Sequence, residues 1–415
     1  MPRLLSLLTR NPDFRRLLLA ELAMLGVDWF VMIPLLTLLP KLTGSGLWGG
    51  LVLAVDTGAI ALLMPVAGPI ADRLDRRVII IGTTSVSICA VLTLQLVRSG
   101  GTAWVALAAI AVAAAAKAFY SPAAQAALPN VVDEEDLALA NAIGGSAWGT
   151  MLVVGASLGG IVSSLAGPYV CFAAAAVCLA PALVLQLRIR RPLQQGRASR
   201  EDSHPVAALR FIGRHPRVLS LVTVKSATGL GNGVLAVFPV LATAVFGIGP
   251  IGTGLFFAAR GAGALIGPLV LRPVLSRRSW LLPGLALSMA LYGLAYLGVS
   301  VAPWFALALP LVALAHFAGG SNWAMSNFGL QTEVPDALRG RVFATDLMIA
   351  TLAVSASQLA AGALVDHVSA RLLIALSGLV TLLYGVGWFL VTRRLMRRAP
   401  DADGAAPDRQ DALSS

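Results

Sequence analysis

Six ionisable residues stand inside long apolar stretches of this sequence, where a charge is retained only beside a partner or a polar cavity. Three are acids and three are bases, so they can neutralise one another if the fold brings them together. A carboxyl held away from water can also bind and release a proton, because desolvation favours its neutral form. The chemistry predicted is therefore charge pairing and proton binding in a central cavity, by Glu21, Asp28, Asp56, Lys117, Lys225 and Arg260.

The position of each acid in its apolar stretch leaves alternatives open. Asp28 lies deepest and is the best candidate for carrying a proton. Glu21, seven residues earlier, shares its helical face, but it is near enough to the charged end to be a solvated partner of the preceding arginines. Asp56 could lie in the outer third of its helix, and the three bases could be structural counter-ions. We interpret Asp346 as an acid at a helix start, where the helix dipole favours negative charge.

Further polar and aromatic side chains within the apolar stretches could line a substrate cavity. Aromatic rings suit bulky amphipathic ligands, and a few polar groups among apolar walls fix a ligand's orientation. A histidine in such a helix is more often a hydrogen-bonded core residue, and that reading stays open here. The cavity candidates are Trp29, His316, Asn322, Trp323, Asn327 and Gln358.

The elements that must position these residues are membrane-spanning helices. The chain has 415 residues, of which 57% are hydrophobic and 12% are charged, and its mean hydropathy is +0.81. A soluble domain carries about 25% charged residues, and a soluble protein of this size could not bury so much apolar surface. The composition excludes a soluble enzyme, a disordered chain and a secreted disulfide scaffold. We expect an all-α membrane protein.

Twelve apolar runs are long enough to cross a bilayer, which takes about 20 residues of helix. Helices are the expected form because lipid offers the backbone no hydrogen-bond partners. The runs lie at 14–38, 47–70, 78–97, 102–124, 141–165, 168–187, 218–246, 249–271, 279–300, 303–330, 342–365 and 371–392.

The distribution of basic residues predicts the orientation of these spans. The chain carries 31 Lys and Arg against 20 Asp and Glu, and nearly all of the basic residues fall on one side. The other side has only Lys41, Arg98 and Arg371. Because cytoplasmic loops are enriched in Lys and Arg, both termini are expected in the cytoplasm of a multi-pass cell-membrane protein. The net charge of +11 is then a topology signal, and no nucleic-acid partner is expected.

A polar, Arg-rich stretch divides the spans six and six. We expect an amino-terminal half at 1–187, a cytoplasmic linker at 188–217 with a short helix near Val206–Gly213, a carboxy-terminal half at 218–395 and a disordered cytoplasmic tail at 396–415. The acidic run Asp133–Asp136 is expected to begin a short helix or to pair with the linker.

Two sequence echoes indicate that the halves are duplicates. Gly68-Pro69, followed after the second span by an arginine pair, is repeated as Gly267-Pro268 after the eighth span. The stretch 125–130 after the fourth span is repeated at 331–336 after the tenth, at nearly the same offset. Pseudo-symmetric halves around a site at mid-depth are a transporter architecture.

At these residues the chain resembles the major facilitator superfamily. The family signature Gly-x-x-x-Asp-Arg-x-Gly-Arg-Arg corresponds to 68–77, with Asp75 in place of the second glycine. The stretches 119–141 and 330–342 are similar to the branch of enterobactin exporters and macrolide-efflux proteins. In the fifth span, 155–160 resembles the antiporter motif Gly-Pro-x-x-Gly-Gly, with Ala156 in place of proline.

The resemblance implies roles for the motif residues. A gating motif would consist of Gly68, Asp72, Arg73, Arg76 and Arg77, in which Asp72 meets a neighbouring helix start and the last two arginines pair with acids or lipid headgroups. A helix-packing motif would consist of Gly155, Gly159 and Gly160, because small residues let helices approach closely.

The function expected is secondary active export of a small organic compound by alternating access, in exchange for protons, acting as a monomer. The resemblance implies a drug, an antibiotic or a siderophore. The alternatives are a lysophospholipid flippase, a small-molecule importer and, in another class, a membrane sensor that transports nothing. No nucleotide-binding loop, metal-ligand spacing or nucleophile–base pair stands out, and Cys89, Cys171 and Cys178 all lie in apolar runs. We therefore expect neither an enzyme nor a cofactor or metal.

Overall fold

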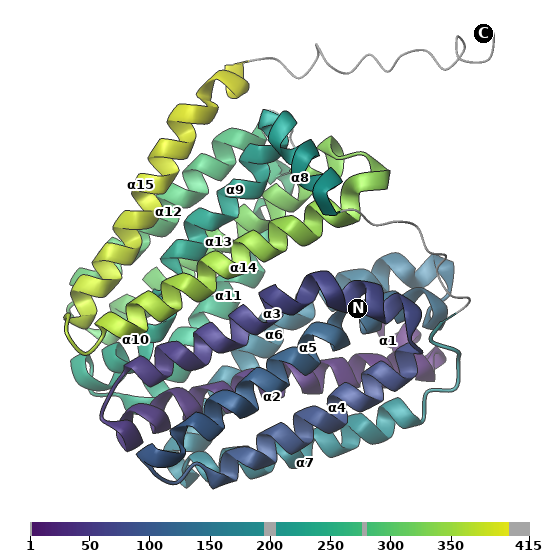
Figure 1. The fold of residues 1–415 in the computed structure, drawn as a ribbon, viewed down its shortest axis with the longest axis horizontal. Coiled ribbons are helices and arrows are strands. Elements are labelled where there is room, and N and C mark those ends of the chain that lie inside the picture. The colour runs from purple at the N-terminus through teal and green to yellow at the C-terminus, as the bar shows by residue number, and fades with distance from the viewer. Residues whose placement is uncertain (1, 195–204, 276–279, 398–415) are drawn as a thin grey trace.

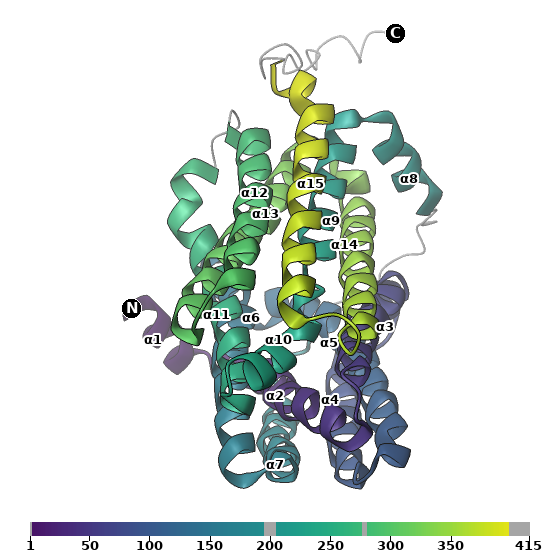
Figure 2. The ribbon, with the colours of Figure 1, turned by 90° about the vertical axis from the view of Figure 1, so that its left-hand side faces the viewer.

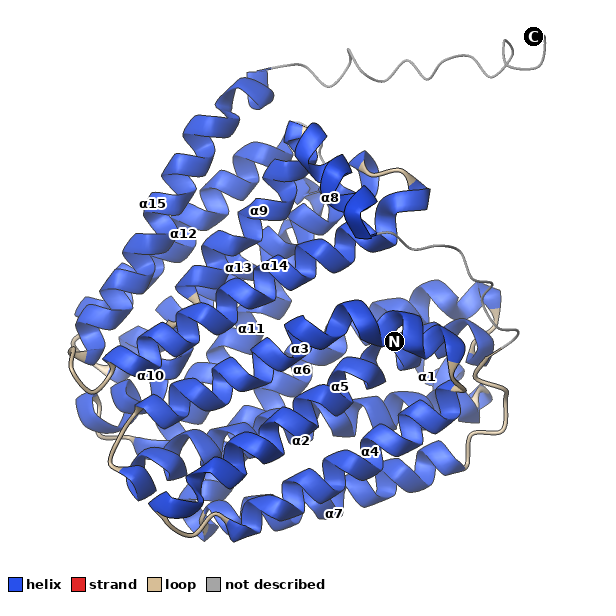
Figure 3. Cartoon of the chain, in the orientation of Figure 1, coloured by secondary structure: helices blue, strands red, loops and turns tan. Residues whose placement is uncertain are grey.

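The computed structural model describes residues 2–194, 205–275 and 280–397, and within these residues it contains helices and no strand (Figure 3). Twelve of the described helical segments are long and apolar enough to cross a membrane. The predicted all-α architecture with twelve spans is confirmed. The predicted tail at 396–415 lies almost entirely outside the described residues.

The ends of the first spans are set by capping residues. Asn11 precedes α2, where its side-chain oxygen accepts the backbone N–H of Phe14 at 2.9 Å, and Pro12 takes the first helical position. Gly44 ends the same helix with φ of 73°. The helices to this point of the chain are α1 (Pro2–Arg10), α2 (Pro12–Thr43), α3 (Leu47–Arg73), α4 (Arg76–Thr93), η1 (Leu94–Leu96), η2 (Gly100–Thr102), α5 (Ala103–Val131), α6 (Glu134–Ala166) and α7 (Pro168–Leu187).

The later helices repeat this plan, with one interrupted span. The seventh span consists of α9, α10 and the π-helix η3, with a break at Asn232 and Gly233. The short helix expected in the linker is confirmed as α8. The elements are α8 (Pro205–Arg214), α9 (Pro216–Gly231), α10 (Val234–Val240), η3 (Leu241–Val245), α11 (Gly249–Leu275), α12 (Leu281–Val301), α13 (Phe305–Glu333), α14 (Asp336–Leu364) and α15 (Ala370–Arg397).

The same helix pairs contact one another in both halves of the chain. In the first half α2 packs on α6 and α7, α3 packs on α5, and α4 packs on α5 and α7. In the second half α9 packs on α14 and α15, α11 packs on α13, and α12 packs on α13 and α15. This matching set of contacts gives the duplicated sequence motifs a structural counterpart.

Two helix seams join the halves: α3 on α14 and α6 on α11 (Figures 1 and 2). Glycines bring the backbones together. A Cβ on Gly50 of α3 would lie 2.5 Å from Cα of Gly362 in α14. In the other seam, a Cβ on Gly160 of α6 would lie 2.7 Å from the carbonyl oxygen of Pro250. Contact this close is possible because Gly50, Gly362 and Gly160 have no side chains that would separate the helix backbones.

The halves are closest at the face opposite the amino terminus and diverge toward the face that carries α1 and the linker (Figure 1). We call these the far face and the linker face. The α6–α11 seam extends inward as far as Gly149, where a Cβ would lie 3.0 Å from Cβ of Leu265. One turn closer to the linker face, Gly144 and Gly145 have no neighbouring atom within 4 Å of an added Cβ. The interface between the halves is therefore closed at the far face and open toward the linker face.

Candidate functional site

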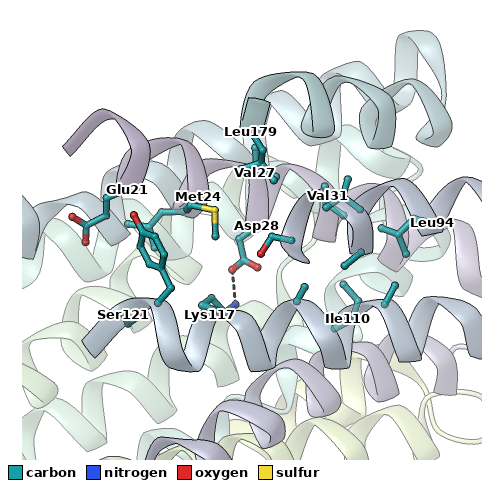
Figure 4. Close-up of a pocket in the computed structure, with 17 residues that line it drawn as sticks. Glu21, Met24, Val27, Asp28, Val31, Leu94, Ile110, Lys117, Ser121 and Leu179 are labelled. Carbon is teal, nitrogen blue, oxygen red and sulfur yellow. Dashed lines mark hydrogen bonds and ion pairs between the residues drawn. The ribbon is translucent and has the colours of Figure 1, made fainter. Parts of the chain in front are cut away.

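A charged triad lies in the middle of the first half. Lys117 of α5 places its Nζ 2.8 Å from Oδ2 of Asp28 in α2 (Figure 4) and 2.9 Å from Oδ1 of Asp56 in α3. Asp56 is 8% exposed, and the other two side chains are part-buried. Two carboxyls sharing one ammonium carry a net charge of −1 unless one of them holds a proton. The triad is thus a site where a single proton changes the charge and loosens one of two ion pairs.

A second ion pair lies in the other half. Lys225 of α9 pairs with Asp346 of α14 and donates to Oδ1 of Asn327 at 2.7 Å, and its Nζ lies 5.2 Å from the ring centre of Trp323. Both charged side chains are enclosed, with 1% and 2% exposure. The interpretation of Asp346 as a helix-start acid is wrong, because α14 begins ten residues earlier, at Asp336. This ion pair joins α9 to α14.

Arg260 of α11 has no acidic partner among the described residues. Its Cζ lies 5.2 Å from the ring centre of Trp29 in α2 and 5.4 Å from that of Trp148 in α6. Its Nε and Nη1 atoms are enclosed without a hydrogen-bond acceptor. Both tryptophans belong to the first half, so this guanidinium lies in the interface between the halves.

The six in-span ionisable residues do not form one cluster. Asp28, Asp56 and Lys117 meet, whereas Lys225 and Arg260, in the second half, form no ion pair with them among the described residues. Glu21 makes no ion pair with these residues, but it lines the same pocket as Asp28 and Lys117, inside the first half between α2, α4, α5 and α7 (Figure 4). The separation follows from the helix pairing, since α5 contacts α2 and α3 but none of the helices of the second half strongly.

Three of the other cavity candidates form hydrogen bonds between helices. His316 is 5% exposed, and its Nε2 lies 2.8 Å from the hydroxyl of Tyr296, which makes it part of the α12–α13 packing. Asn322 is fully buried and donates to Ser288 of α12 at 2.9 Å. Gln358 accepts a hydrogen bond from Thr57 at 2.9 Å across the α3–α14 seam, so it joins the two halves.

Comparison with known proteins decides the family. The Major Facilitator Superfamily profile matches residues 18–345. The chain belongs to the major facilitator superfamily. It is 27% identical over 369 residues to the enterobactin exporter EntS of Escherichia coli O1:K1 / APEC, covering 81% of this chain and 82% of that protein. EntS of Escherichia coli O45:K1 (strain S88 / ExPEC) matches equally.

Solved structures of transporters share the fold. A POT family transporter in complex with a thioalcohol-conjugated peptide superposes with a TM-score of 0.75 at 12% identity, covering 93% of this chain and 96% of that one. A bacterial homologue of the human lysosomal transporter Spinster gives a TM-score of 0.70 at 16% identity, covering 94% and 99%. The chain is therefore a multi-pass membrane transporter of the major facilitator superfamily.

The superfamily signature lies at the linker face, where its arginines hold the start of the linker. Arg77 donates to the carbonyl oxygen of Ile189. Arg76 donates to the carbonyl oxygens of Ala126, at 2.8 Å, and Leu193, at 3.3 Å. Arg77 therefore binds the backbone of the linker, and its expected pairing with an acid or a lipid headgroup stays a prediction. The surroundings of Gly68 and of the Asp72 side chain are not described, and the side chain of Arg73 is exposed.

An acid at the start of α2 completes this attachment of the linker. Asp13 is 6% exposed and accepts the backbone N–H groups of Arg190, at 3.2 Å, and Arg191, at 3.0 Å. The acidic run begins α6, and its Asp133 pairs with Arg191 at 3.0 Å, while Asp136 pairs with Arg10. The linker therefore leaves the first half from a fixed point.

The glycines of the fifth span contact two different partners. A Cβ on Gly155 would lie 2.3 Å from the carbonyl oxygen of Gly26, and one on Gly159 would lie 2.6 Å from that of Phe30, so both let α6 pack on α2. Gly160 instead contacts α11 across the seam between the halves. The motif therefore serves packing within the first half and closure of the far face.

Some residues of the transporter's interface escaped the sequence reasoning. Asp366, in the turn between α14 and α15, accepts hydrogen bonds from the hydroxyl of Ser45 and, at 2.8 Å, from the backbone N–H of Gly46. Nothing in the sequence signals this contact, because an acid in a short polar turn is common. Trp148 was likewise not predicted, because the sequence of an apolar helix does not show that one of its tryptophans lies near Arg260.

The far-face contact gives a prediction for pH dependence. Burial acts to raise the pKa of Asp366, but hydrogen bonds from Ser45, Gly46 and Leu47 outweigh it and hold the pKa below its ordinary value of 3.8. A carboxylate with a lowered pKa stabilises the closed face at higher pH and loses this contribution as the pH falls through that pKa. The contribution of Asp366 to the closed far face should therefore be constant between pH 8 and pH 5.

Spin labels at positions 104 and 304 would measure this. Trp104 and Trp304 lie at far-face ends of the two halves and are 63% and 62% exposed. In a cysteine-free background that also carries Asp28→Asn and Asp56→Asn, which removes the triad's own response to protons, the distance between labels should stay constant from pH 8 to pH 5, whereas adding Asp366→Ala should add a longer-distance population at every pH. A distance that lengthens within this range in that background, or an unaltered distribution after Asp366→Ala, would contradict the assignment.

Proposed function

We propose that this transporter exports a small organic compound across the cytoplasmic membrane, by alternating access and in exchange for protons. The observation that carries the proposal is the triad of Asp28, Lys117 and Asp56, in which two carboxyls compete for one cation at mid-depth. Such groups within a membrane mark ion and proton pathways. Similarity to EntS, an enterobactin exporter, supports export of a compound such as a siderophore, an antibiotic or a drug.

The linker face is taken as cytoplasmic, because the Lys and Arg residues outside the spans concentrate there. With this orientation, the divergence of the halves toward the linker face corresponds to a state open to the cytoplasm. A compound would enter between the halves from the cytoplasm and leave after the far face opens and the linker face closes.

Asp56 offers a route from protonation to this movement. It precedes Thr57, whose hydroxyl donates to Gln358 across the α3–α14 seam, and Ser355 of α14 donates to the carbonyl oxygen of Ala54 at 2.8 Å. Protonation of Asp56 would remove its ion pair with Lys117 and leave α3 held less firmly to α5. Because α3 is one side of the seam, a change in its hold on α5 alters the interface between the halves.

The test is an efflux screen in cells with and without the protein, over antibiotics, dyes and siderophores. A compound exported only by cells carrying the protein should accumulate again when a protonophore collapses the proton gradient. Accumulation driven inward by the protein would show import, and export that survives the protonophore would refute the coupling.

The residue-level test replaces one carboxyl of the triad. Asp28→Asn keeps the size of the side chain and mimics a permanently protonated state, so it should lower proton-dependent export at least tenfold. Glu134→Gln, which changes an exposed acid at the start of α6, is the matched control and should export normally. Wild-type export by the Asp28→Asn variant, at an equal amount of folded protein, would remove Asp28 from the mechanism.

A further inference from the structure

Arg260 differs from the two lysines within the spans. Lys117 and Lys225 each contact a carboxylate, whereas no acid lies within 4.0 Å of Arg260 among the described residues. Its Nε and Nη1 groups are enclosed and have no acceptor in the part of the chain that the structure describes. Leaving buried donors of a charged group unsatisfied is costly, so such an arrangement calls for an acceptor that the chain itself does not supply.

The surroundings of Arg260 restrict what this acceptor can be. Trp29 and Trp148 lie near the guanidinium, and Phe257 packs beside Trp29 with ring centres 5.5 Å apart. Aromatic rings stabilise the cation through their faces but accept none of the N–H groups along its edge. The site therefore offers flat apolar walls beside a guanidinium with unsatisfied donors, which an anionic oxygen such as that of a carboxylate or a phenolate would satisfy.

Arg260 also lies where the space between the halves begins. The next residue, Gly261, contacts Gly149 and Leu152 of α6, and this is the inner end of the α6–α11 seam. On the linker-face side, Gly145 of α6 has no neighbour within 4 Å of an added Cβ. A compound entering from the linker face would therefore meet the guanidinium before it meets the closed far face.

We propose that Arg260, with Trp29 and Trp148, binds an anionic group carried on a planar aromatic ring, so that the transported compound is an aromatic organic anion. This inference rests on the proposed export function. A cell interior at negative potential favours outward movement of an anion, so the charge recognised by Arg260 agrees with the proposed direction. Both halves contribute to the site, which would place the bound compound at the interface that must reorganise.

The test compares a charged ligand with its uncharged analogue. The full chain, reconstituted in nanodiscs, is titrated by equilibrium dialysis with 2-naphthoate and with 2-naphthamide, which have the same ring. Wild type should bind 2-naphthoate at least tenfold more tightly. Arg260→Gln should remove this preference, Arg260→Lys should retain part of it, and Trp148→Leu should weaken both ligands by similar factors.

Arg98→Gln is the matched control, because Arg98 also stacks on an aromatic ring, that of Tyr169 at 3.7 Å, but is remote from the interface. It should leave the preference unchanged. Equal binding of the two ligands by wild type, binding of neither, or a preference that persists in folded Arg260→Gln would overturn the proposal.

Efflux measurements separate this proposal from the proposed function. Proton-dependent export of neutral compounds only, with no preference for the anion, would refute the anion site and leave the export function standing. A preference for the anion in dialysis without any proton-dependent export would refute the proposed export function and leave the anion site standing.

Discussion

Lys117→Met is expected to abolish proton-coupled export, with a loss of at least a hundredfold in rate per molecule of folded protein. The variant leaves Asp28 and Asp56 together in an enclosed site without a cation. Removing one partner of a buried ion pair costs about 3–5 kcal/mol when the remaining charge stays ionised. Protonation of the two carboxyls is the cheaper outcome, and carboxyls that stay protonated cannot carry protons in a cycle.

The measurement is export of a compound from the efflux screen, together with alkalinisation of the medium as protons enter. Lys117→Arg keeps the charge and should retain part of the coupling. Lys41→Met is the matched control, because Lys41 is an exposed lysine at the far-face end of α2, and it should export normally. Coupled export by Lys117→Met at half the wild-type rate or more would rule out the triad as the proton site.

Gly50→Val is expected to prevent closure of the far face and to reduce export more than tenfold. A Cβ at this position would lie 2.5 Å from Cα of Gly362 and 2.9 Å from the carbonyl oxygen of Gln358, and backbone atoms cannot swing aside as a flexible side chain can. The α3–α14 seam must therefore separate. We expect the protein to stay folded, because the clash falls between the halves and not within one of them.

Two label pairs would show the change. The distance between labels at 104 and 304 on the far face should lengthen, and the distance between labels at 74 and 340 on the linker face should shorten. Gly82→Val is the matched control, since an added Cβ on Gly82 of α4 meets nothing within 4 Å. Unchanged distances in Gly50→Val, with normal export, would show that the close approach of Gly50 and Gly362 has no part in the cycle.

The spans were predictable because lipid imposes one solution on every long apolar run, and the motif of Gly155, Gly159 and Gly160 marked where α6 approaches other helices. For the candidate site, the sequence indicated which residues were candidates but not which of them contact one another. An acid within a membrane span is easy to recognise as a candidate, because burying its charge costs free energy, and this identified Asp28 and Asp56. Which lysine it meets depends on helix pairing, and the sequence contains no distance between α5 and α3.

The misreading of Asp346 has the same origin. Its run of apolar residues begins near 342, so the acid seemed to stand at a helix start, whereas α14 extends back to Asp336 through charged residues. Hydropathy marks where lipid begins and not where a helix begins. Likewise, Arg76 and Arg77 were expected to pair with acids or lipid headgroups, and their hydrogen bonds to linker and helix carbonyls were not predicted, because every residue has a backbone carbonyl and no sequence motif singles one out.

The interruption of the seventh span bears on how the far face can open. At Asn232 and Gly233 the regular ladder gives way: the N–H of Leu235 bonds to Asn232 at 3.1 Å, and that of Ala236 bonds to Gly233 at 3.1 Å. The outer piece, α10, touches α3, α14 and α15. Breaking an intact helix inside lipid would expose bare peptide groups. Because the break is already present, a change in the angle between α10 and α9 would break no further helical hydrogen bonds, and α9 would remain joined to α14 by the pair of Lys225 and Asp346.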